Sequence, residues 1–400
     1  MTTGRVSSTV VDGWDGVRRP GAHGIPLDTP PGTATDVGTP AADGVAPIEA
    51  DLPGAVTDDL AAFLAVKRAA CVDVAEEFVE AADDLLALVL SGGKRLRPTF
   101  AWWAWRAAGG LGGVPAAAVL RATSALELVQ GCALVHDDLI DDSATRRGEP
   151  TVHARWQARH RAGGWVGSPD RLGAAVAVLV GDVALAWADD MLRDAALDPA
   201  VLARVTPVWE AMRTEVLAGQ FLDVVAHATD ASSPEAALRI SRYKTAAYTV
   251  ERPMHLGAAL AGADDAVVAA YRGFGVDLGI AFQLRDDLLG VFGDPAVTGK
   301  PAGDDLREGK RTLLVALARH HPDTARAAAV ERALGVADLD ADTLAAARDA
   351  LVDLGVVDEV EARIDALTAS GLAALDTVDL DTTARGRLTA LAVAATRRTS

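Results

Sequence analysis

The sequence predicts an all-α fold, and three observations lead to this prediction. The chain has 400 residues, of which 50% are hydrophobic, enough for one large helical domain or two ordinary ones. Alanine is abundant, whereas aromatic residues make up only 4% of the chain. Alternating runs of β-branched and aromatic residues, which are typical of strands, are scarce.

The first 52 residues differ in character from the rest. Residues 1–52 are rich in Gly, Pro, Thr, Asp and Val, contain Pro30-Pro31 and show no sustained hydrophobic period. A segment of this composition buries too little apolar surface to offset the entropy of folding, which predicts a disordered tail. A functional tail is the alternative. Residues 53–400 are predicted to form a single domain.

Helical periodicity begins near residue 57, where the run TDD supplies a cap and an acidic first turn. This helix is expected to reach Leu90, since the run SGG that follows is a common helix end. A Trp-rich helix follows Pro98, and Pro115 opens another that runs to Asp142. Loops are expected at 146–150, 163–169 and 293–309, and further helices at about 171–194, 199–228, 234–262, 264–291, 308–320, 323–333, 341–353, 355–375 and 381–397.

The first chemical signal is the run HDDLIDD, residues 136–142. Asp137 and Asp141 are four residues apart and share a helix face, with Asp138 beside them. Adjacent carboxylates in an apolar helix repel one another and lose hydration, so a bound cation explains them well. Oxygen ligands at this spacing suit Mg²⁺, which completes its shell with waters and substrate phosphates. The alternative is a solvated acidic face.

A second acidic cluster, QLRDDLLGVFGD, begins at Gln283 and also sits in an apolar stretch. Gln283 lies one turn before Asp286 and Asp287, on the same face. A charged helix end is the alternative, but few other residues nearby are polar. Two such helices facing each other can hold metal ions between them, as helical bundles commonly do.

Basic residues accompany both acidic clusters. Arg binds phosphate through two parallel hydrogen bonds and Lys binds it as a point charge, so both suit a site for a diphosphate. A lone basic pair is usually solvated surface, but several such motifs flank the two acidic helices. The residues concerned are Lys94, Arg95, Arg97, Arg146, Arg147, Lys244, Lys300 and Lys310.

Composition narrows the class of protein further. A formal net charge of −18 argues against a general nucleic-acid binder, whose affinity comes from neutralising phosphates. Cys71 and Cys132 lie in apolar, helix-like settings and are expected to be free thiols in a reducing compartment. The longest apolar run, residues 172–187, is interrupted by Asp182, so no transmembrane segment is expected. The N-terminus lacks a secretory signal pattern, which predicts a cytoplasmic protein.

The order and spacing of these motifs resemble those of trans-type isoprenyl diphosphate synthases, the polyprenyl synthetase family. The matching runs are GGKRLRP, ELVQGCALVHDDLIDDSATRRGEPTVH, GQFLD, KTA, FQLRDDLLG and GKPAGDDLREGKRT, between residues 92 and 312. The resemblance extends over about residues 57–400. It implies a terpenoid-synthase-type helical bundle around a central cavity, a homodimer, and isopentenyl and allylic diphosphates as substrates.

The resemblance also implies a role for each matching residue. Up to three Mg²⁺ ions would be held by Asp137, Asp138, Asp141, Asp286 and Asp287. Isopentenyl diphosphate would be held by Lys94, Arg97, Gln130 and Arg147. The allylic diphosphate would meet Arg146, Lys244, Thr245, Gln283 and Lys300, with Lys310 supporting the same pocket and Gln220 and Asp223 matching the GQxxD motif. Those expected to act on the reacting groups are Asp137, Asp141, Lys244, Thr245, Gln283 and Asp286.

One position departs from the family's pattern. The usual second motif is DDxxD, but residue 290 is glycine, and Asp294 lies too far along the helix to replace it. The first Asp of the motif normally carries most of the coordination, so activity is expected to persist. We expect the glycine at residue 290 to affect the affinity of this helix face for the metal ion.

Product length is predicted from the residues one turn before Asp137. Cys132 and Ala133 are small, whereas an aromatic residue at this place often closes the cavity in relatives with shorter products. One helical turn rises about 5.4 Å, roughly one isoprene unit. The resemblance is greatest to geranylgeranyl diphosphate synthases, which favours the C20 product. If Trp102, Trp103 or Trp187 closes the cavity instead, the product is farnesyl diphosphate or a longer chain.

Two other classes of protein are alternatives to the synthase. A terpene cyclase shares the fold but needs no isopentenyl site, whereas GGKRLRP, Gln130 and the run RRG indicate one. A non-catalytic subunit of a heteromeric synthase usually lacks the first acidic motif, which is complete in this chain. Both are therefore less favoured.

Overall fold

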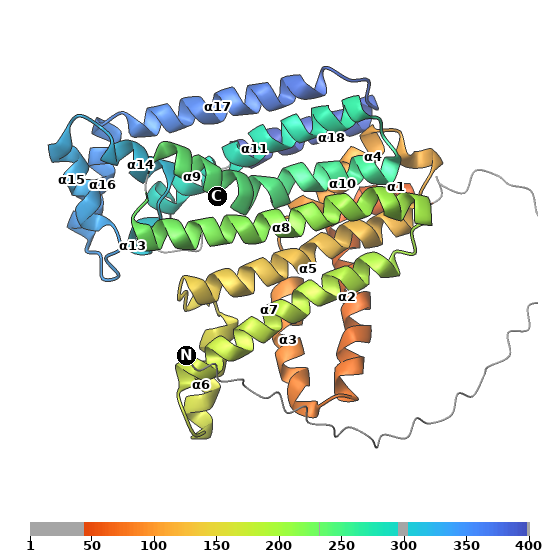
Figure 1. The fold of residues 1–400 in the computed structure, drawn as a ribbon, viewed down its shortest axis with the longest axis horizontal. Coiled ribbons are helices and arrows are strands. Elements are labelled where there is room, and N and C mark those ends of the chain that lie inside the picture. Colours follow the sequence, from red (N-terminus) through yellow and green to blue (C-terminus); the bar gives the residue numbers. More distant parts are fainter. Residues whose placement is uncertain (1–43, 232, 295–302, 398–400) are drawn as a thin grey trace, which may run out of the picture. The chain divides into compact units, whose positions relative to one another are not determined.

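The computed structural model describes residues 44–231, 233–294 and 303–397, and most of them lie in helices (Figure 1). This confirms the predicted all-α fold. Residues 40–400 form one compact unit, and the description below concerns its described part. Most of the segment predicted to be a disordered tail lies outside the described residues, as does Lys300.

The N-terminal half of the described chain contains eight α-helices and one short hairpin. They are α1 (Val45–Ala50), α2 (Leu52–Val72), α3 (Glu76–Leu90), α4 (Leu96–Ala107), the 3₁₀ turn η1 (Gly110–Gly112), α5 (Ala116–Ile140), β1 (Thr145–Arg146), β2 (Glu149–Pro150), α6 (Val152–Gly163), α7 (Pro169–Asp194) and α8 (Pro199–Thr229).

The C-terminal half of the described chain consists of helices and the loops between them. Its elements are α9 (Pro234–Ile240), the π-helix η2 (Ser241–Glu251), α10 (Arg252–Ala261), α11 (Asp265–Phe292), α13 (Asp304–Arg307), α14 (Leu313–Arg319), α15 (Thr324–Ala333), α16 (Ala341–Asp353), α17 (Val356–Leu375) and α18 (Thr382–Thr396).

The start of the helical region differs from the prediction. Helix α1 already occupies Val45–Ala50, inside the segment assigned to the tail. The cap of α2 is Asp51 rather than Thr57, because the Asp51 carboxylate accepts a hydrogen bond from the backbone N–H of Gly54 at 3.0 Å. The single helix predicted up to Leu90 is two helices, and the chain turns between them at residues 73–75.

Three other segments also depart from the prediction. The helix expected over 234–262 is interrupted by η2, whose backbone winds as a π-helix. The loop at 146–150 contains the β1–β2 hairpin, with Thr145 opposite Pro150. The helix expected from 308 begins only at Leu313, because the Thr312 side chain caps α14 by accepting from the N–H of Val315.

Helix α5 lies at the centre of the arrangement. It packs against α7 along its length and also contacts α4 and α2. The π-helix η2 packs against both α8 and α11, and α11 is covered by α17. In Figure 1, α5, α7, α8, α10 and α11 run alongside one another, while α14, α15 and α16 gather near the ends of α8 and α11. This arrangement brings the two acidic motifs, on α5 and α11, into one bundle.

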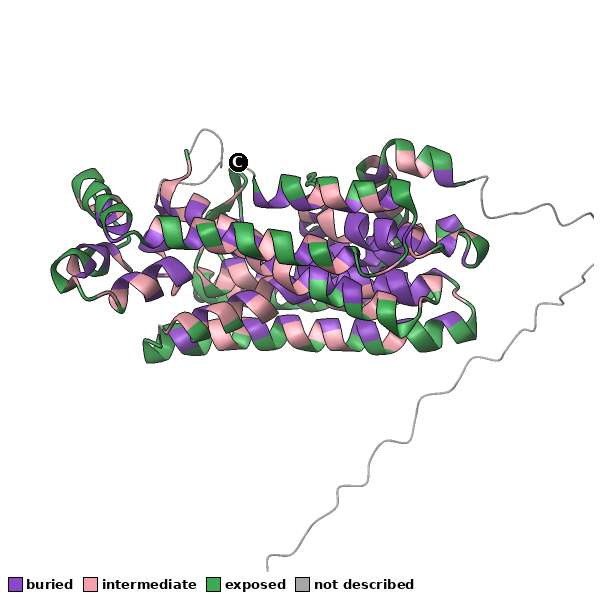
Figure 2. Ribbon diagram, turned by 90° about the horizontal axis from the view of Figure 1, so that it is seen from above, coloured by how far each residue is buried: buried purple, intermediate pink, exposed green. Residues whose placement is uncertain are grey.

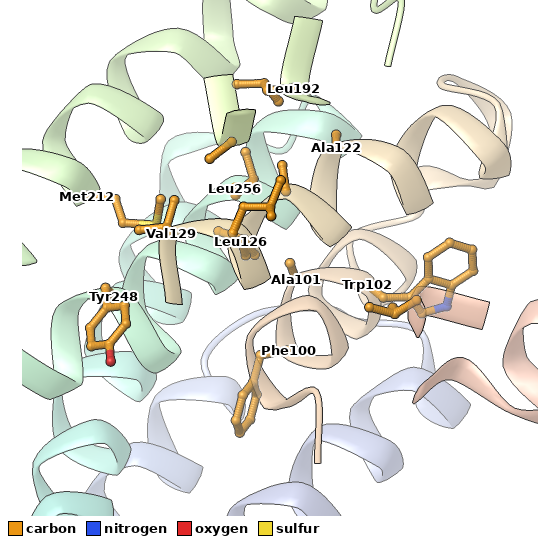
Figure 3. Packing of buried hydrophobic residues seen from close by; sticks show 14 of the residues in the cluster. Phe100, Ala101, Trp102, Ala122, Leu126, Val129, Leu192, Met212, Tyr248 and Leu256 are labelled. Atoms are coloured by element: carbon orange, nitrogen blue, oxygen red, sulfur yellow. The ribbon is translucent and has the colours of Figure 1, made fainter. Parts of the chain in front are cut away.

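The core is apolar and most dense where α4 meets α5 and α10. Phe100, Trp102 and Trp105 of α4 are fully buried, and the ring of Phe100 meets that of Phe274 edge-on at 6.3 Å. Figure 3 shows Phe100 and Trp102 below Leu126 and Leu256 of the neighbouring helices. The outer helices are buried along one side, as Figure 2 shows, whereas α4 is buried nearly all round.

Three helices are long and apolar enough to cross a bilayer by length and composition. They are α5, α7 and α11, and the most apolar stretch of α5 is 67% buried inside the protein, against 33% for α7. Helices α5 and α11 also carry the aspartates of both acidic motifs. The absence of a membrane-spanning segment remains a prediction.

The contact of α10 with α4 depends on Gly257. A Cβ atom at this position would overlap the carbonyl oxygen of Ala101 and lie 2.8 Å from the backbone nitrogen of Trp105. Both are backbone atoms of a buried helix, so the two helices would have to separate.

We expect Gly257→Ala to lower the free energy of unfolding by about 1–3 kcal/mol through this overlap. The matched control is Gly386→Ala in α18, where a Cβ meets nothing within 4 Å. Because alanine favours a helix over glycine, the control should be neutral or slightly stabilising. Urea unfolding followed by circular dichroism measures both, and equal midpoints for the two variants would contradict the expectation.

Candidate active site

A cavity of about 860 Å³ opens between α5, α8, η2 and α11. Its polar wall is made by both acidic motifs and by most of the predicted cations. Its apolar wall comes from α5, α7 and α8. The polar residues include Asp137, Arg146, Gln220, Asp223, Lys244, Gln283, Asp286, Asp287 and Lys310, and the apolar ones include Cys132, Ala133, Val178, Leu185, Leu217 and Phe221.

Asp137 of the first motif is the most heavily bonded of these carboxylates. Its Oδ1 accepts hydrogen bonds from Lys244 Nζ at 2.9 Å and from Gln220 Nε2 at 3.0 Å. Lys244 also donates to Asp223 Oδ2 at 2.6 Å. Burial raises the pKa of Asp137, but the ammonium groups of Lys244 and Lys310 outweigh burial and hold this pKa below its ordinary value. The GQxxD and KTA motifs therefore converge on the first acidic motif.

Asp138 of the first motif pairs with Arg146. It is 4% exposed, and both of its oxygens accept from Arg146, with Nε at 2.8 Å and 2.9 Å. Burial raises the pKa of Asp138 against the influence of Arg146. Asp138 does not belong to the cavity wall that the described residues form. Asp138 therefore holds Arg146 in place in this structure, and its predicted role as a metal ligand stays a prediction.

The β1–β2 hairpin separates the two adjacent arginines. Arg147 and Gly148 both have positive φ, of 54° and 81°, as a two-residue type I′ turn requires. Arg146, on the strand, reaches Asp138, whereas Arg147, in the turn, donates from Nη1 to the carbonyl oxygen of Gly92 at 2.9 Å. The two neighbouring residues thereby lie in different surroundings: Arg146 lines the cavity, whereas Arg147 is not among its described lining residues.

The predicted isopentenyl residues lie around α4 and the preceding loop. Arg97 stacks on Tyr248 of η2, with its Cζ atom 4.1 Å from the ring centroid, and donates to Thr249 Oγ1 at 3.0 Å. The Tyr248 hydroxyl donates to Gln130 Oε1 at 2.8 Å. Arg97 and Gln130 line the cavity, whereas Lys94 is exposed in the loop and is not among the lining residues.

Arg95 of the same loop is structural. Its side chain is buried, forms an ion pair with Glu127 at 2.9 Å and donates to the carbonyl oxygen of Val89 at 2.8 Å. Its backbone adopts a left-handed conformation with φ of 47°, which only a firmly held side chain makes tolerable. Arg95 therefore fixes the loop that presents Lys94 and Arg97.

In the second motif, Gln283 links η2 to Asp287. The Thr245 hydroxyl donates to Gln283 Oε1 at 2.5 Å, and Gln283 Nε2 donates to Asp287 Oδ1 at 2.7 Å. Asp287 is buried, and burial together with the neighbouring carboxylates of Asp305 and Asp286 raises its pKa well above the ordinary value. Asp286 lines the same cavity.

Lys310 links the first motif to the segment after the second. Its Nζ lies 2.6 Å from Glu308, 3.3 Å from Asp305 and 4.0 Å from Asp141. Burial lowers the pKa of Lys310, but these three carboxylates raise it well above the ordinary value. Burial and the charge of Asp137 raise the pKa of Asp141 to about 6.

Several residues of the cavity wall were not predicted, and four of them carry polar side chains close to the two acidic motifs or to Lys244. Tyr248 and Thr249 follow the KTA motif on η2, and Asp305 and Arg311 come from the segment after the second motif. Arg311 pairs with Asp230 at 2.8 Å, but its Nε and Nη1 are buried without a hydrogen-bond partner in the described part of the chain. Such N–H groups at a cavity wall suit an anion. Tyr248 and Thr249 follow the KTA run, and Asp305 and Arg311 lie within the run GKPAGDDLREGKRT, so their position next to these motifs could have indicated them.

Comparison with known proteins agrees with this geometry. Residues 79–351 match the family model described as "Polyprenyl synthetase". The chain belongs to the polyprenyl synthetase family.

Several characterised relatives refine this assignment. The chain is 35% identical to a geranylgeranyl diphosphate synthase of Mycobacterium tuberculosis, over 69% of this chain and 77% of the relative. It is 39% identical to a farnesyl diphosphate synthase of Mycobacterium bovis, over 56% of each chain. A geranylgeranyl pyrophosphate synthase of Corynebacterium glutamicum, solved with isoprenyl diphosphate and magnesium, has a TM-score of 0.83 and 46% identity, covering 86% of this chain and 98% of its own.

The chain is accordingly a prenyltransferase that condenses isopentenyl diphosphate with allylic diphosphates. In the described residues, no three His, Cys, Asp or Glu side chains converge closely enough to hold a metal ion by themselves. The carboxylates of Asp137, Asp286 and Asp287 nevertheless face one cavity, whereas Asp141 is not among its described lining residues and lies 4.0 Å from Lys310, which is. This donor set fits Mg²⁺, which binds through one or two carboxylates together with substrate phosphates.

The residues proposed to limit product length also face the cavity. Cys132 and Ala133 are in its wall, and the Cys132 thiol lies 3.7 Å from His136 Nδ1. Trp102, Trp103 and Trp187 are absent from the part of the wall that the described residues make. Closure of the cavity by one of these tryptophans, the alternative raised from the sequence, therefore finds no support.

The raised pKa of Asp141 leads to a pH-dependent prediction. A carboxyl group must lose its proton to bind a metal ion, and with a pKa of about 6 Asp141 is mostly ionised at pH 7.5 but mostly protonated at pH 5.5. We expect the apparent Mg²⁺ affinity to fall as the pH drops through about 6, with proton release on binding near that pH. Calorimetry in buffers of different ionisation enthalpy measures this release. Asp141→Asn is the control, and equal proton release from both proteins would exclude Asp141 as its source.

Proposed function

We propose that the enzyme requires Mg²⁺ and makes geranylgeranyl diphosphate as its main product. The observation that carries this proposal is one cavity with both acidic motifs on its polar wall and the small residues Cys132 and Ala133 on its apolar wall. Relatives that act as geranylgeranyl diphosphate synthases support the product length, and the magnesium in the Corynebacterium structure supports the metal.

The polar wall holds the allylic diphosphate and stabilises its departure. Mg²⁺, held by Asp137, Asp141 and Asp286, would supply Lewis acidity and orient the diphosphate. Arg146, Lys244 and Lys310 carry fixed positive charge next to these carboxylates, where negative charge develops on the leaving group. These fixed charges lower the barrier to breaking the C–O bond because they are already oriented.

The residues of η2 and α11 face the allylic cation that results. The Gln283 amide is held at both ends, by the Thr245 hydroxyl and by Asp287, so the orientation of its dipole is fixed. Its carbonyl oxygen lies on the side of η2 and stabilises positive charge there. The isopentenyl diphosphate, bound near Arg97, Gln130 and Arg147, presents its double bond to the cation. The released diphosphate then takes the proton, so no side-chain base is required.

The apolar wall protects the cation and accommodates the growing chain. Val178, Leu185, Leu217 and Phe221 line the cavity beyond the acidic motif. Apolar side chains offer the cation no nucleophile of their own. Farnesyl diphosphate is the second candidate product, because relatives that make it match this chain at 39% identity. A homodimer in the cytoplasm is the expected state.

Product analysis tests the proposed function. The purified protein is incubated with isopentenyl diphosphate and each allylic starter, of five, ten or fifteen carbons, with Mg²⁺ or with EDTA. We expect a C20 diphosphate with Mg²⁺ and none with EDTA. Asp137→Ala, which removes the carboxylate that joins Lys244 and Gln220, should lose at least about 10²-fold in kcat. A C15 end point, or full turnover in EDTA, would refute the corresponding half of the proposal.

A second prediction concerns the apolar wall. Ala133→Phe places an aromatic ring in the cavity and should shorten the main product from C20 to C15. Ala133→Ser keeps the side chain small and serves as the control, with C20 retained. Chromatography of the dephosphorylated products distinguishes the chain lengths. A C20 product from Ala133→Phe would show that the chain grows along another wall.

A further inference from the structure

An ion pair inside η2 joins two residues that are nine positions apart. Arg242, near the start of η2, donates from Nη1 to Oε2 of Glu251, its last residue. Glu251 is fully buried, and its Oε1 accepts from Nε of Arg272 on α11 at 3.0 Å. Burial raises the pKa of Glu251, but the guanidinium groups of Arg242 and Arg272 outweigh burial and hold this pKa below its ordinary value. Glu251 is therefore an ionised carboxylate inside the bundle.

The spacing of this pair fits a π-helix and not an α-helix. In an α-helix nine residues make about 2.5 turns, so side chains at 242 and 251 would point in opposite directions. A π-helix has i→i+5 hydrogen bonds and about 4.4 residues per turn, so nine residues make about two turns and both side chains lie on one face. This winding persists to the end of η2, where the backbone N–H of Arg252 donates to the carbonyl oxygen of Ala247, five residues earlier.

The helix face that carries the pair is turned away from the cavity. Arg242 and Glu251 are not among the described lining residues, whereas Lys244, Thr245 and Tyr248 are. Two residues of a π-helix make nearly half a turn, so Lys244 lies on the side opposite Arg242. A change to α-helical winding would rotate Glu251 by roughly half a turn relative to Arg242, toward the side of Lys244. The buried carboxylate would then lose its partner in η2.

The C-terminal end of η2 is firmly held by its neighbours. A Cβ atom on Gly275 of α11 would lie 2.3 Å from the Cα of Glu251, so the two backbones are in contact there. The next residue, Arg252, donates from Nε to Glu215 of α8 at 2.8 Å. The ion pair connects this anchored end to the start of η2, where the paired arginine precedes Lys244 by two residues.

We propose that the Arg242–Glu251 ion pair keeps η2 in its π-helical winding, and that it thereby positions Lys244 for the allylic diphosphate. The inference rests on the role proposed for Lys244 at that diphosphate. Arg242 and Glu251 are positioning residues, because they lie away from the cavity and act through the direction of the Lys244 side chain. Lys244 donates to Asp137 at 2.9 Å and to Asp223 at 2.6 Å, and a rewound η2 would turn its amine away from both.

Variants at the two arginines that hold Glu251 test this proposal. Arg242→Gln breaks the pair inside η2 and leaves Glu251 paired with Arg272. Arg272→Gln is the matched control, because it removes the other guanidinium and leaves the pair inside η2 intact. Arg242→Lys keeps the positive charge. The readout is KM for the ten-carbon allylic diphosphate with Mg²⁺ and saturating isopentenyl diphosphate, and thermal unfolding verifies that each variant is folded.

We expect Arg242→Gln to raise this KM about tenfold, because displacing the Lys244 amine by about 1 Å weakens its hold on the substrate. Arg272→Gln and Arg242→Lys should stay within about threefold of the wild type, since both keep a charged pair inside η2. Glu251→Gln, which breaks the same pair from its other end and keeps the side-chain shape, is the second variant and should behave like Arg242→Gln.

A double-mutant cycle with Lys244→Ala distinguishes positioning from a general loss of stability. Lys244→Ala should itself raise KM by about tenfold or more, since it removes the amine altogether. If Arg242 acts through Lys244, adding Arg242→Gln to Lys244→Ala should change KM by less than about twofold. A double variant whose KM rises by the product of the two single effects would refute the positioning role.

The outcomes separate the inference from the proposed function. If Lys244→Ala raises KM whereas Arg242→Gln and Arg272→Gln have equal effects, the role of the ion pair is refuted and the role of Lys244 stands. If Lys244→Ala leaves KM unchanged, the role proposed for Lys244 fails, and the inference fails with it.

Discussion

Burial of carboxylates in an apolar helical bundle is the constraint on which the rest of this structure depends. Ionised groups in such a setting lose hydration and repel one another unless cations lie close. Here Asp137, Asp138 and Asp141 each have a basic partner from outside α5: Asp137 has Lys244, Asp138 has Arg146 of the nearby hairpin, and Asp141 faces Lys310. Lys244 is 107 residues away from Asp137 in the chain. The ion pairs therefore connect η2, the hairpin and the segment before α14 to α5.

Such pairing requires close contact between helices, and glycines make it possible. A Cβ atom on Gly219 of α8 would overlap the backbone nitrogen of Lys244, and one on Gly279 of α11 would lie 2.5 Å from the Cα of Ala246. The π-helix is thus in backbone contact with both neighbours. Its wider winding directs Lys244, Thr245 and Tyr248 toward the cavity. A regular helix held at side-chain distance could not bring Lys244 within 3 Å of both Asp137 and Asp223.

The all-α fold and the acidic and basic character of the site could be predicted because both depend on residue types and their spacing in the sequence. Aspartates inside an apolar helix require a partner wherever they fold, so Asp137, Asp141 and Asp286 could be identified without coordinates. The pairing of Asp138 with Arg146 could not be predicted, because spacing cannot distinguish a carboxylate that faces the cavity from one that holds Arg146. The π-helix was missed because the hydrophobic period of residues 234–262 fits an ordinary helix equally well. Tyr248 and Asp305 were missed because only the packing of η2 and α13 brings them to the cavity.

The ion pairs also bear on how the site takes up its substrate. Lys244 and Lys310 lie beside the carboxylates and keep them ionised. A metal ion that binds without diphosphate is therefore repelled by the positive charge of these lysines. A diphosphate arriving alone meets the carboxylates of Asp137 and Asp141. With both present, Lys244 and Lys310 would pair with phosphate oxygens, and the carboxylates of Asp137 and Asp141 would hold the metal ion. Every charge then remains paired, which favours joint uptake of metal and diphosphate over binding of either one alone.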